Sequence, residues 1–456
     1  MATAPPNILL LIADDFGVHQ LGRTSGGAGF FATPHLDQLA AQGVRFARAY
    51  ATAPVCSPAR ASLYTGMHPA RLHLTDFIPG SVVDNPPLLM PEWQRGLPVS
   101  AITLGDAFKA AGYHTAHFGK WHLAPDYNYQ PGRAMDPESQ GFDEVFVTRK
   151  PRPEADPEHD PHHVQALTAR AIEYCTRPRD RPFLCVVAHN SIHRPELAPA
   201  RVIEKYARQP GADETMNRPV LAAMVEEMDK GVGRLMEALA ASGRGRDTLV
   251  IFTADHGPVG PADTRQPLRG AKADLYEGGL RVPLLLRWPG RIPTGAVREQ
   301  PVTGADLFPT VLEVAKIKSA EPVDGSSLWP MIENGGHRLV HDALFWHYPH
   351  YHHLGIAPAG AIQADGWKLI EWFEPSLGAA GALTPRCELF NLEADPAETH
   401  DLAPTERTHC EQLLGRLRDW RRSVGAQEMR LNPHFDPRQP TRILPPALDT
   451  SALEAP

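Results

Sequence analysis

The sequence predicts an α/β protein in which a large mixed, mostly parallel sheet is sandwiched by helices and followed by a smaller C-terminal α+β subdomain with an antiparallel sheet. Short continuous apolar runs, which are typical of strands buried on both faces, alternate with amphipathic helical segments. The 456 residues are 42% hydrophobic and 21% charged, as in folded proteins that bury a substantial core. After residue 328 the composition changes to aromatic, histidine-rich segments, which indicates a second structural unit.

The first predicted strand covers residues 7–12, a continuous apolar run that ends in a loop carrying Asp14 and Asp15. A helix is predicted between Thr33 and Gly43. Threonine is a common N-cap, proline is favoured in the first helical turn, and glycine often follows the last turn. These elements form one β-loop-α unit whose strand ends in two acidic side chains.

Later segments repeat this alternation. Strands are predicted at residues 182–187 and 248–253, and helices at residues 103–111 and 220–239. The last helix is the clearest, because eight apolar residues recur on one face over about five turns. Ligands of such folds bind beyond the carboxyl ends of the strands, so we expect the functional site in strand-end loops.

The C-terminal part shows shorter alternating strands, predicted at residues 361–364 and 367–370. We place a boundary near residue 340, which gives a larger unit over residues 1–340 and a C-terminal subdomain over residues 341–456. The proline-rich end of the chain, from residue 432 onward, is expected to run extended over the surface.

Composition and charge argue against several kinds of partner. A formal net charge of −8 disfavours a nucleic-acid or anionic-membrane surface built from bulk charge. The longest apolar run is too short to span a bilayer, and the first residues lack the pattern of a signal peptide. We therefore expect a cytoplasmic protein, or a periplasmic or secreted one if an export signal was trimmed. Five scattered cysteines do not suit a disulfide scaffold.

The sharpest motif is the pentapeptide Cys56-Ser57-Pro58-Ala59-Arg60. It resembles the signature of the type I sulfatases of the alkaline phosphatase superfamily, in which this cysteine is oxidised to formylglycine. Further segments match that family's motifs in the same order: Asp14-Asp15, Gly119-Lys120-Trp121-His122, His193-Arg194-Pro195, Asp255-His256-Gly257, Arg269-Gly270-Ala271-Lys272, and residues 277–283. The resemblance covers residues 7 to about 290 and continues more loosely through residues 388–398.

This resemblance implies an alkaline-phosphatase-like fold with residues 1–340 as the catalytic domain. It also implies hydrolysis of sulfate monoesters, carried by an arylsulfate or by a sulfated carbohydrate as in carbohydrate exosulfatases. The nucleophile would be the hydrate of a formylglycine that a maturation enzyme makes from Cys56. A hydrated aldehyde offers one hydroxyl to attack sulfur and a second whose deprotonation expels sulfate, which a thiol cannot do.

Three aspartates supply hard oxygen ligands for a divalent cation in this family, and their counterparts are Asp14, Asp15 and Asp255. Position 56 and His256 complete the implied metal site. The carboxylate oxygens make Ca²⁺ the expected cation. Many relatives carry an amide where His256 stands, and because imidazole is a softer donor, Mg²⁺ and Mn²⁺ are the alternatives. The structural alternative for Asp14 and Asp15 is that the two acids cap a turn and bind no metal.

The resemblance also assigns catalytic side chains. Arg60 would orient the nucleophile and bind sulfate or the metal-site acids, while Lys120 and Lys272 would act as point charges on the sulfate oxygens. By family position, His122 is the base that triggers collapse of the intermediate, and His193 donates a proton to the leaving alcohol. The two histidine roles could be exchanged or shared with Lys272.

A histidine-rich tract follows the proposed boundary and surrounds the segment Tyr348-Pro349-His350-Tyr351, which resembles that of carbohydrate exosulfatases. We expect its imidazoles and aromatic rings to form a pocket wall for a sugar; a separate metal site is the alternative. The segment from residue 75 to 80 would form a rim. The substrate-binding candidates are Asp76, His347, His350 and His352.

Three other functions stay open. A phosphonate monoester or phosphodiester hydrolase of the same superfamily shares the nucleophile and an Asp-His metal pair. A catalytically silent anion-binding module would keep Cys56 unmodified. A cysteine hydrolase using Cys56 and a histidine gives no role to the three aspartates and two lysines. For the favoured function, the expected partner is a small anionic substrate, a sulfate ester.

Overall fold

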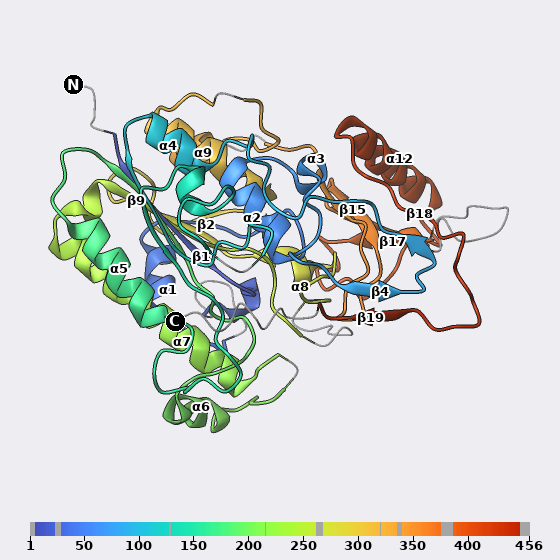
Figure 1. Ribbon diagram of the computed structural model, residues 1–456, viewed down its shortest axis with the longest axis horizontal. Coiled ribbons are helices and arrows are strands. Elements are labelled where there is room, and N and C mark those ends of the chain that lie inside the picture. The colour runs from blue at the N-terminus through green and yellow to red at the C-terminus, as the bar shows by residue number, and fades with distance from the viewer. Residues whose placement is uncertain are drawn as a thin grey trace.

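The computed structural model gives the arrangement of most of the chain (Figure 1). It describes the following residues: 5–22, 29–126, 129–214, 216–260, 268–319, 321–334, 340–374 and 386–446.

An eight-stranded sheet forms the centre of the protein, with the strand order β12-β2-β11-β9-β1-β8-β6-β7 (Figure 1). Strand β11 runs antiparallel to both of its neighbours, and the remaining pairs are parallel. The predicted mixed, mostly parallel sheet is therefore confirmed. In the order of the chain its strands are β1 (Asn7–Ala13), β2 (Val44–Phe46), β6 (His114–Gly119), β7 (Glu144–Val147), β8 (Phe183–Ala188), β9 (Thr248–Ala254), β11 (Leu284–Arg287) and β12 (Ala296–Arg298).

Helices cover both faces of this sheet (Figure 1). In the described part of the chain, the helices of eight or more residues are α1 (Pro34–Ala41), α2 (Cys56–Thr65), α5 (Val164–Thr176), α6 (Ala200–Ala207), α7 (Pro219–Ala241), α9 (Leu307–Ala315) and α12 (Arg407–Ser423), the last of which packs on the C-terminal sheet. The shorter ones are α3 (Pro69–Leu72), α4 (Leu104–Ala110), α8 (Glu277–Leu280) and α10 (Trp329–Asn334). Among the described residues, none of these helices has the length and apolar character needed to cross a membrane.

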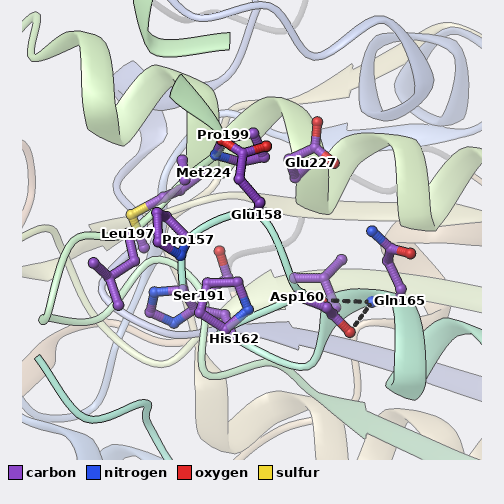
Figure 2. A pocket seen from close by; sticks show the side chains of 13 residues that line it. Pro157, Glu158, Asp160, His162, Gln165, Ser191, Leu197, Pro199, Met224 and Glu227 are labelled. Atoms are coloured by element: carbon purple, nitrogen blue, oxygen red, sulfur yellow. Dashed lines mark hydrogen bonds between the residues drawn. The ribbon is translucent and has the colours of Figure 1, made fainter. Parts of the chain in front are cut away.

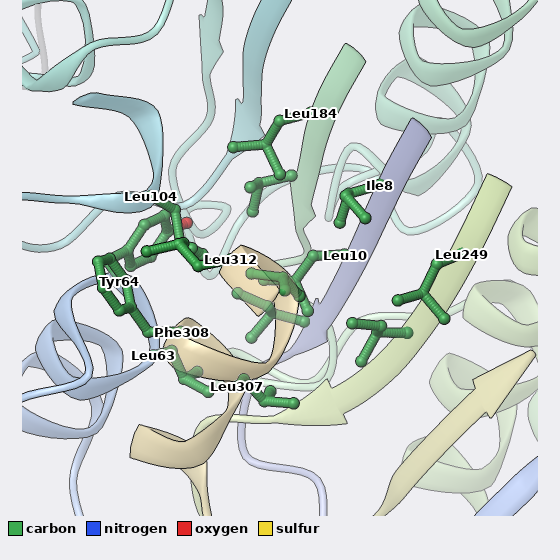
Figure 3. Close-up of a cluster of buried hydrophobic side chains, with 14 of the residues drawn as sticks. Ile8, Leu10, Leu63, Tyr64, Leu104, Leu184, Leu249, Leu307, Phe308 and Leu312 are labelled. Carbon is green, nitrogen blue, oxygen red and sulfur yellow. The ribbon is translucent and has the colours of Figure 1, made fainter. Parts of the chain in front are cut away.

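Strand β1 shows why a continuous apolar run is needed at the centre of the sheet. Alternate side chains of a strand point to opposite faces, and here both faces are covered. Ile8 and Leu10 pack with α2, α4 and α9 in one core (Figure 3). Leu9 and Leu11 pack with α1, α5 and α7 in the other core. Every residue of β1 is buried as a result.

The C-terminal unit contains a four-stranded antiparallel sheet, β14 (Leu344–Tyr348), β15 (Ala359–Ala364), β16 (Trp367–Trp372) and β17 (Arg386–Asn391). One face packs against the first unit, where Trp346 and Tyr50 share a buried cluster. The other face packs against Leu413 and Leu417 of α12. The proposed boundary at residue 340 lies beside residues 335–339, which are outside the described residues, so the division stays a prediction.

The described residues also form three smaller sheets. A three-stranded sheet joins β3 (Ala49–Tyr50), β10 (Arg281–Val282) and β13 (Val302–Thr303). Two ribbons pair β4 (Val82–Asp84) with β19 (Arg442–Leu444), and β5 (Leu88–Leu89) with β18 (Arg430–Leu431). The end of the chain is extended in these strands, as expected, but it is also paired. Residues 447–456 of the expected tail lie outside the described residues.

The predicted helices and strands agree with the structure to within two residues at each end. The helix predicted between Thr33 and Gly43 is confirmed, but the predicted capping by the threonine side chain is wrong. Thr33 precedes α1 with Pro34 in the first turn, although the threonine hydroxyl makes no capping bond there. It accepts a hydrogen bond from the backbone of Gly22 instead.

A buried ion cluster connects the C-terminal sheet to the first unit. Lys368 of β16 is fully buried and lies 3.2 Å from the carboxylate of Glu277 and 3.0 Å from that of Glu398. Glu398 also accepts a hydrogen bond of 2.7 Å from the backbone nitrogen of Glu277. Tyr50 donates a further bond of 3.0 Å to Glu277. Each charge in this cluster depends on its partners because none of them reaches water.

We expect Lys368→Met to destabilise the protein by about 3–5 kcal/mol, because it leaves two buried carboxylates without their cation. The midpoint of thermal unfolding, followed by circular dichroism, should fall by several degrees. Lys318→Met, at an exposed lysine after α9, is the matched control and should leave the midpoint unchanged. Equal midpoints for the two variants would contradict this role.

Candidate active site

The carboxyl edge of the central sheet brings together side chains from four neighbouring strands. Asp14 and Asp15 follow β1, Asp255 follows β9, Lys120 follows β6, and His193 lies in the loop after β8. Because these strands are parallel and adjacent in the sheet, their carboxyl ends lie side by side. The predicted position of the site in strand-end loops follows from this topology.

Glycine at position 119 allows Lys120 to leave β6 close to β8. Gly119 has a φ of 107°, and a Cβ atom there would lie 1.9 Å from the carbonyl oxygen of Ala188. The backbone nitrogen of Lys120 then donates to that same oxygen over 2.8 Å. A side chain at position 119 would push the two strands apart and displace Lys120.

Helix α2 begins at Cys56, which places this residue at the positive end of the helix dipole. Arg60 lies one turn later, on the same side of the helix. All ten residues of α2 are buried, and Cys56 is 2% exposed. Position 56 is therefore fixed in place by helix packing and shielded from bulk water.

The Cys56 sulfur lies within contact distance of three charged or titratable groups. It is 3.1 Å from Nε2 of His256, 3.4 Å from Nζ of Lys272 and 3.6 Å from Oδ1 of Asp14. Burial raises the pKa of this thiol, but Lys120 and Lys272 outweigh burial and lower the pKa to about 5. The environment of position 56 thus stabilises negative charge on the atom at this place.

Four of the predicted metal ligands form a compact buried cluster. Asp14, Asp15, Cys56 and His256 each offer one ligand atom, and these atoms all lie within 4.8 Å of one another. The Oδ2 atom of Asp15 is buried without a hydrogen-bond partner among the described residues. Such an orphaned carboxylate oxygen is the kind of group that a cation would satisfy.

The orientation of His256 suits a ligand role. Its Nδ1 lies 2.8 Å from the carbonyl oxygen of Gly257, which can only accept a hydrogen bond, so the proton belongs on Nδ1. Its Nε2 faces the cluster, 3.4 Å from Asp15. A backbone carbonyl that holds one ring nitrogen while the other faces the cation is the usual support of a metal-binding histidine. The residues present therefore fit a divalent cation.

Asp255, the remaining predicted ligand, is held by other groups in this structure. Nε of Arg60 donates a hydrogen bond of 3.0 Å to its Oδ2, and Nη2 of Arg60 forms an ion pair of 2.9 Å with the same oxygen. Its Oδ1 accepts from the backbone nitrogens of His256 and Asp15 over 2.9 and 3.2 Å. It thus connects the two backbone segments of the cluster, and its assignment as a direct ligand stays a prediction.

Three buried cations balance the aspartates. Lys120 lies 2.7 Å from Asp14, and Lys272 lies 2.8 Å from Asp15. Burial raises the pKa of Asp15, but Lys272 and His193 outweigh it and lower the pKa to about 2. Arg60 is the third cation, at 3.6 Å from Asp14 and within hydrogen-bond distance of Asp255. A metal ion would add further positive charge, so the cluster favours an anionic ligand.

The two predicted proton-transfer histidines lie on different sides of the cluster. His193 is half-buried, with Nε2 3.9 Å from Asp15 and Nδ1 2.7 Å from the carbonyl oxygen of Arg194. His122 lies next to Lys120, and its Nε2 is 2.7 Å from the carbonyl oxygen of Ile78. In both rings a backbone carbonyl fixes one nitrogen as the donor.

Two of these site residues also have unusual backbone conformations. Asp15 and His122 have φ values of 60° and 61°, in the left-handed region that residues other than glycine rarely adopt. Such conformations cost about 1–3 kcal/mol each and cluster at functional sites.

Asp76 and His350 meet beside the cluster. Asp76 is buried, accepts a hydrogen bond of 2.7 Å from the hydroxyl of Tyr348, and lies 3.9 Å from Nδ1 of His350. Burial raises the pKa of Asp76 to about 7. Nε2 of His350 is 2.8 Å from the hydroxyl of Thr75. The two predicted substrate-binding residues are thus linked across the loop and the C-terminal sheet, and sequence reasoning gave no separate role to Tyr348.

The other two substrate-binding candidates are separated from each other. His352 lies against Phe77, with ring centroids 5.0 Å apart. Burial lowers the pKa of His352, and the charges of Lys272 and His256 lower it further. His347 instead contacts the carbonyl oxygen of Gln427 over 2.8 Å and packs against Phe373. Residues 347 and 348 alternate along β14, so His347 points away from the face that carries Tyr348.

A separate cavity of about 40 Å³ lies next to the loop that follows β8 (Figure 2). Glu158, His162, Ser191 and Met224 are among the residues that line it. The carbonyl oxygen of Ser191 accepts a hydrogen bond of 3.0 Å from the backbone of Asp14. None of the predicted site residues lines the cavity, so it is distinct from the charged cluster.

Comparison with known proteins points to one family. The family model described as Sulfatase matches residues 6–317, and the model described as "N-sulphoglucosamine sulphohydrolase, C-terminal" matches residues 271–422. Arylsulfatase A of Homo sapiens is 30% identical over 448 residues, with 87% of this chain and 83% of that protein covered.

Solved structures share the fold. The structure titled "Crystal structure of Ps i-CgsB in complex with k-i-k-neocarrahexaose" is 25% identical, has a TM-score of 0.73, and covers 91% of this chain and 93% of its own. A phosphonate monoester hydrolase of Agrobacterium radiobacter is 21% identical with a TM-score of 0.67, and the match covers 91% of this chain and 96% of its own. At that identity the second match shows a common fold only.

We expect Asp15→Asn to weaken binding of a divalent cation by at least about tenfold, because it removes the charge of a carboxylate whose buried Oδ2 has no hydrogen-bond partner among the described residues. Metal content after dialysis, measured by plasma mass spectrometry, should fall accordingly. Asp84→Asn, at an exposed aspartate in β4, is the control and should keep the metal. Unchanged metal content in Asp15→Asn would place the cation elsewhere.

Proposed function

This chain belongs to the sulfatase family and hydrolyses sulfate monoesters, and we propose that it acts through a formylglycine hydrate at position 56 and a divalent cation. We propose further that its substrate is a small or terminal sulfated carbohydrate or an arylsulfate. One observation supports this mechanism above the others. The sulfur of Cys56 lies among Asp14, His256 and Lys272 at the start of a buried helix.

The formylglycine hydrate supplies one hydroxyl that attacks sulfur and a second that, after losing its proton, drives release of sulfate. The groups around position 56 suit both events. The positive end of α2 and the two lysines stabilise an oxyanion at this position. Burial to 2% exposure keeps bulk water away from the attacking atom. Conversion of Cys56 requires a maturation enzyme, which we include in the proposal.

Lys120, Lys272 and Arg60 provide the binding charge for sulfate. The two lysines are each about one-tenth exposed, so the ammonium groups face the site more than the solvent. Arg60 is fully buried and donates to Asp255 and to the carbonyl oxygen of Lys120, which keeps its guanidinium rigid. Preorganised cations in a water-poor site stabilise charge that develops in the transition state without reorganisation.

His122 and His193 carry the proposed proton transfers. The carbonyl of Ile78 fixes the proton on Nε2 of His122, which leaves Nδ1 as the nitrogen able to accept a proton from position 56. For His193, the carbonyl of Arg194 holds Nδ1, so Nε2 is the atom that can donate to the leaving alcohol. Lys272 lies close enough to share either task.

We propose Ca²⁺ as the cation, with Asp14, Asp15, His256, Asp255 and the modified position 56 as its ligands. When bound, the cation lowers the pKa of the attacking hydroxyl and neutralises sulfate oxygens. The carboxylate oxygens favour a hard cation, and the imidazole of His256 is what keeps Mg²⁺ and Mn²⁺ as alternatives.

The proposed carbohydrate preference rests on the rim beside the cluster. Asp76, His350 and His352 present a buried carboxylate and imidazole rings between loop and sheet. Sugars are commonly bound by a few polar groups set among aromatic surfaces. His347 is the weakest member of this set, because its ring contacts Gln427 and Phe373 instead.

We expect Cys56→Ala to lower turnover of 4-nitrophenyl sulfate by at least about a thousandfold, because no side chain then supplies the nucleophile. Intact-mass analysis of active wild-type protein should show a mass that fits replacement of the CH₂SH group by CHO. Cys410→Ala, at a half-buried cysteine of α12, is the matched control. Full activity in Cys56→Ala with an unchanged melting temperature would refute the mechanism.

A sulfate ester and a phosphodiester of 4-nitrophenol, compared as substrates, distinguish a sulfatase from the alternative, a phosphonate monoester or phosphodiester hydrolase. We expect the enzyme to hydrolyse 4-nitrophenyl sulfate with a higher kcat/KM than methyl 4-nitrophenyl phosphate, since both esters carry a single negative charge and differ at the reacting centre. Initial rates under one set of conditions give the comparison. A preference for the diester by orders of magnitude would favour the alternative.

A further inference from the structure

Lys150 stands next to the candidate active site but has no role in the mechanism above. It lies three residues beyond the end of β7, and β7 pairs in parallel with β6 through Gly119 and Val147. The backbone nitrogen of Thr148 donates to the carbonyl oxygen of Gly119 over 3.2 Å. Lys120 and Lys150 therefore leave the same edge of the sheet from neighbouring strands.

The surroundings of Lys150 differ from those of the three buried cations. Its side chain is exposed, and no described residue forms a salt bridge or hydrogen bond with its ammonium group. Partial burial of its stem lowers its pKa, and so do the charges of Lys120 and Lys272. Lys150 is thus an uncompensated positive charge at the solvent side of a site that already holds cations.

A pair of imidazole rings lies on the same side. His352 and His353 are stacked, with centroids 4.4 Å apart and planes at 24°. Burial lowers the pKa of both rings, and the charge of Lys272 lowers both further. Lys150 also lowers the pKa of His353, so the pair is neutral at pH 7. Neutral, flat surfaces next to an unpaired ammonium group suit a ring that carries a negative charge.

We propose that Lys150 binds a second anionic group of the substrate, a carboxylate or a second sulfate on the leaving-group side, and so makes the enzyme prefer doubly anionic sulfate esters. This inference rests on the sulfatase activity proposed above. In the mechanism proposed above, Lys120, Lys272 and Arg60 bind the reacting sulfate, so that mechanism has no need of a further exposed cation. The rest of the substrate must extend toward solvent, where Lys150 lies.

Repulsion among the lysines gives the physical reason for such a preference. Lys120 and Lys272 each have an aspartate partner, whereas Lys150 has none among the described residues. A second anion on the substrate would compensate this charge on binding, and a neutral group in its place would leave the ammonium group unpaired. The preference for doubly anionic substrates is expected to fall as ionic strength rises, because the ammonium group of Lys150 is exposed to solvent.

The test uses derivatives of 4-nitrophenyl sulfate that differ only at ring position 3. One derivative carries a carboxylate, one a sulfonate, and one the neutral carboxamide. The measured quantity is the ratio of kcat/KM for each charged derivative to that for the carboxamide. We expect about a tenfold ratio for the wild-type enzyme at low salt.

The variants change only the charge at position 150. Lys150→Ala should bring the ratio close to one, and Lys150→Glu should bring it below one by charge repulsion. Lys318→Glu makes the same charge change at a remote exposed lysine and should keep the wild-type ratio. Melting temperatures of all variants, measured in parallel, show that each is folded.

The outcomes separate this inference from the proposed function. A ratio that is the same in wild type, Lys150→Ala and Lys150→Glu overturns the role of Lys150. Loss of the ratio for the carboxylate alone, or for the sulfonate alone, supports the role and identifies the group that is bound. If wild-type protein carrying converted Cys56 hydrolyses none of the aryl sulfates, the proposed function itself fails.

Discussion

Charge compensation inside the protein governs the arrangement of the candidate active site. The aspartates at the carboxyl edge of the central sheet are at most 1% exposed, and a carboxylate removed from water in this way is costly unless a cation or a hydrogen-bond donor faces it. Each of them has a basic partner from a different part of the chain: Lys120 for Asp14, Lys272 for Asp15, and Arg60 for Asp255. Oδ2 of Asp15 has no hydrogen-bond partner among the described residues, so it is the oxygen of this cluster that is best placed to bind an added cation.

The C-terminal sheet also contributes contacts to the loops around this cluster. Trp346 of β14 donates a hydrogen bond of 2.7 Å to the carbonyl oxygen of Ala51, five residues before Cys56. Tyr348 on the same strand donates a hydrogen bond to Asp76. The loop that carries Asp76 also contacts His122, through the carbonyl oxygen of Ile78. The substrate side of the site therefore depends on contacts between two units that are far apart in the sequence.

Much of this structure could be predicted from local pattern. The buried run of β1, the periodic helix α7 and the acids at strand ends follow from hydrophobic spacing and from the geometry of parallel sheets. The charged cluster could be assigned only because its motifs resemble a known family. Position along the chain does not show which face of β14 carries His347, because a strand one residue out of register exchanges its two faces. Lys150 was missed since nothing in its local sequence marks it; only the pairing of β7 with β6 does.

The two ribbons at the edge of the protein bear on the order of events during biosynthesis. Strands β4 and β5 find their partners near the end of the chain, and Asn85 hydrogen-bonds to the carbonyl oxygen of Asp436, 351 residues later. At ~5–20 residues per second, a ribosome needs roughly 20–70 s to deliver that partner. During this interval the segment after Asp76 has emerged with unpaired edges. A nascent chain cut short before residue 430 would therefore keep these edges open, however well its central sheet had folded.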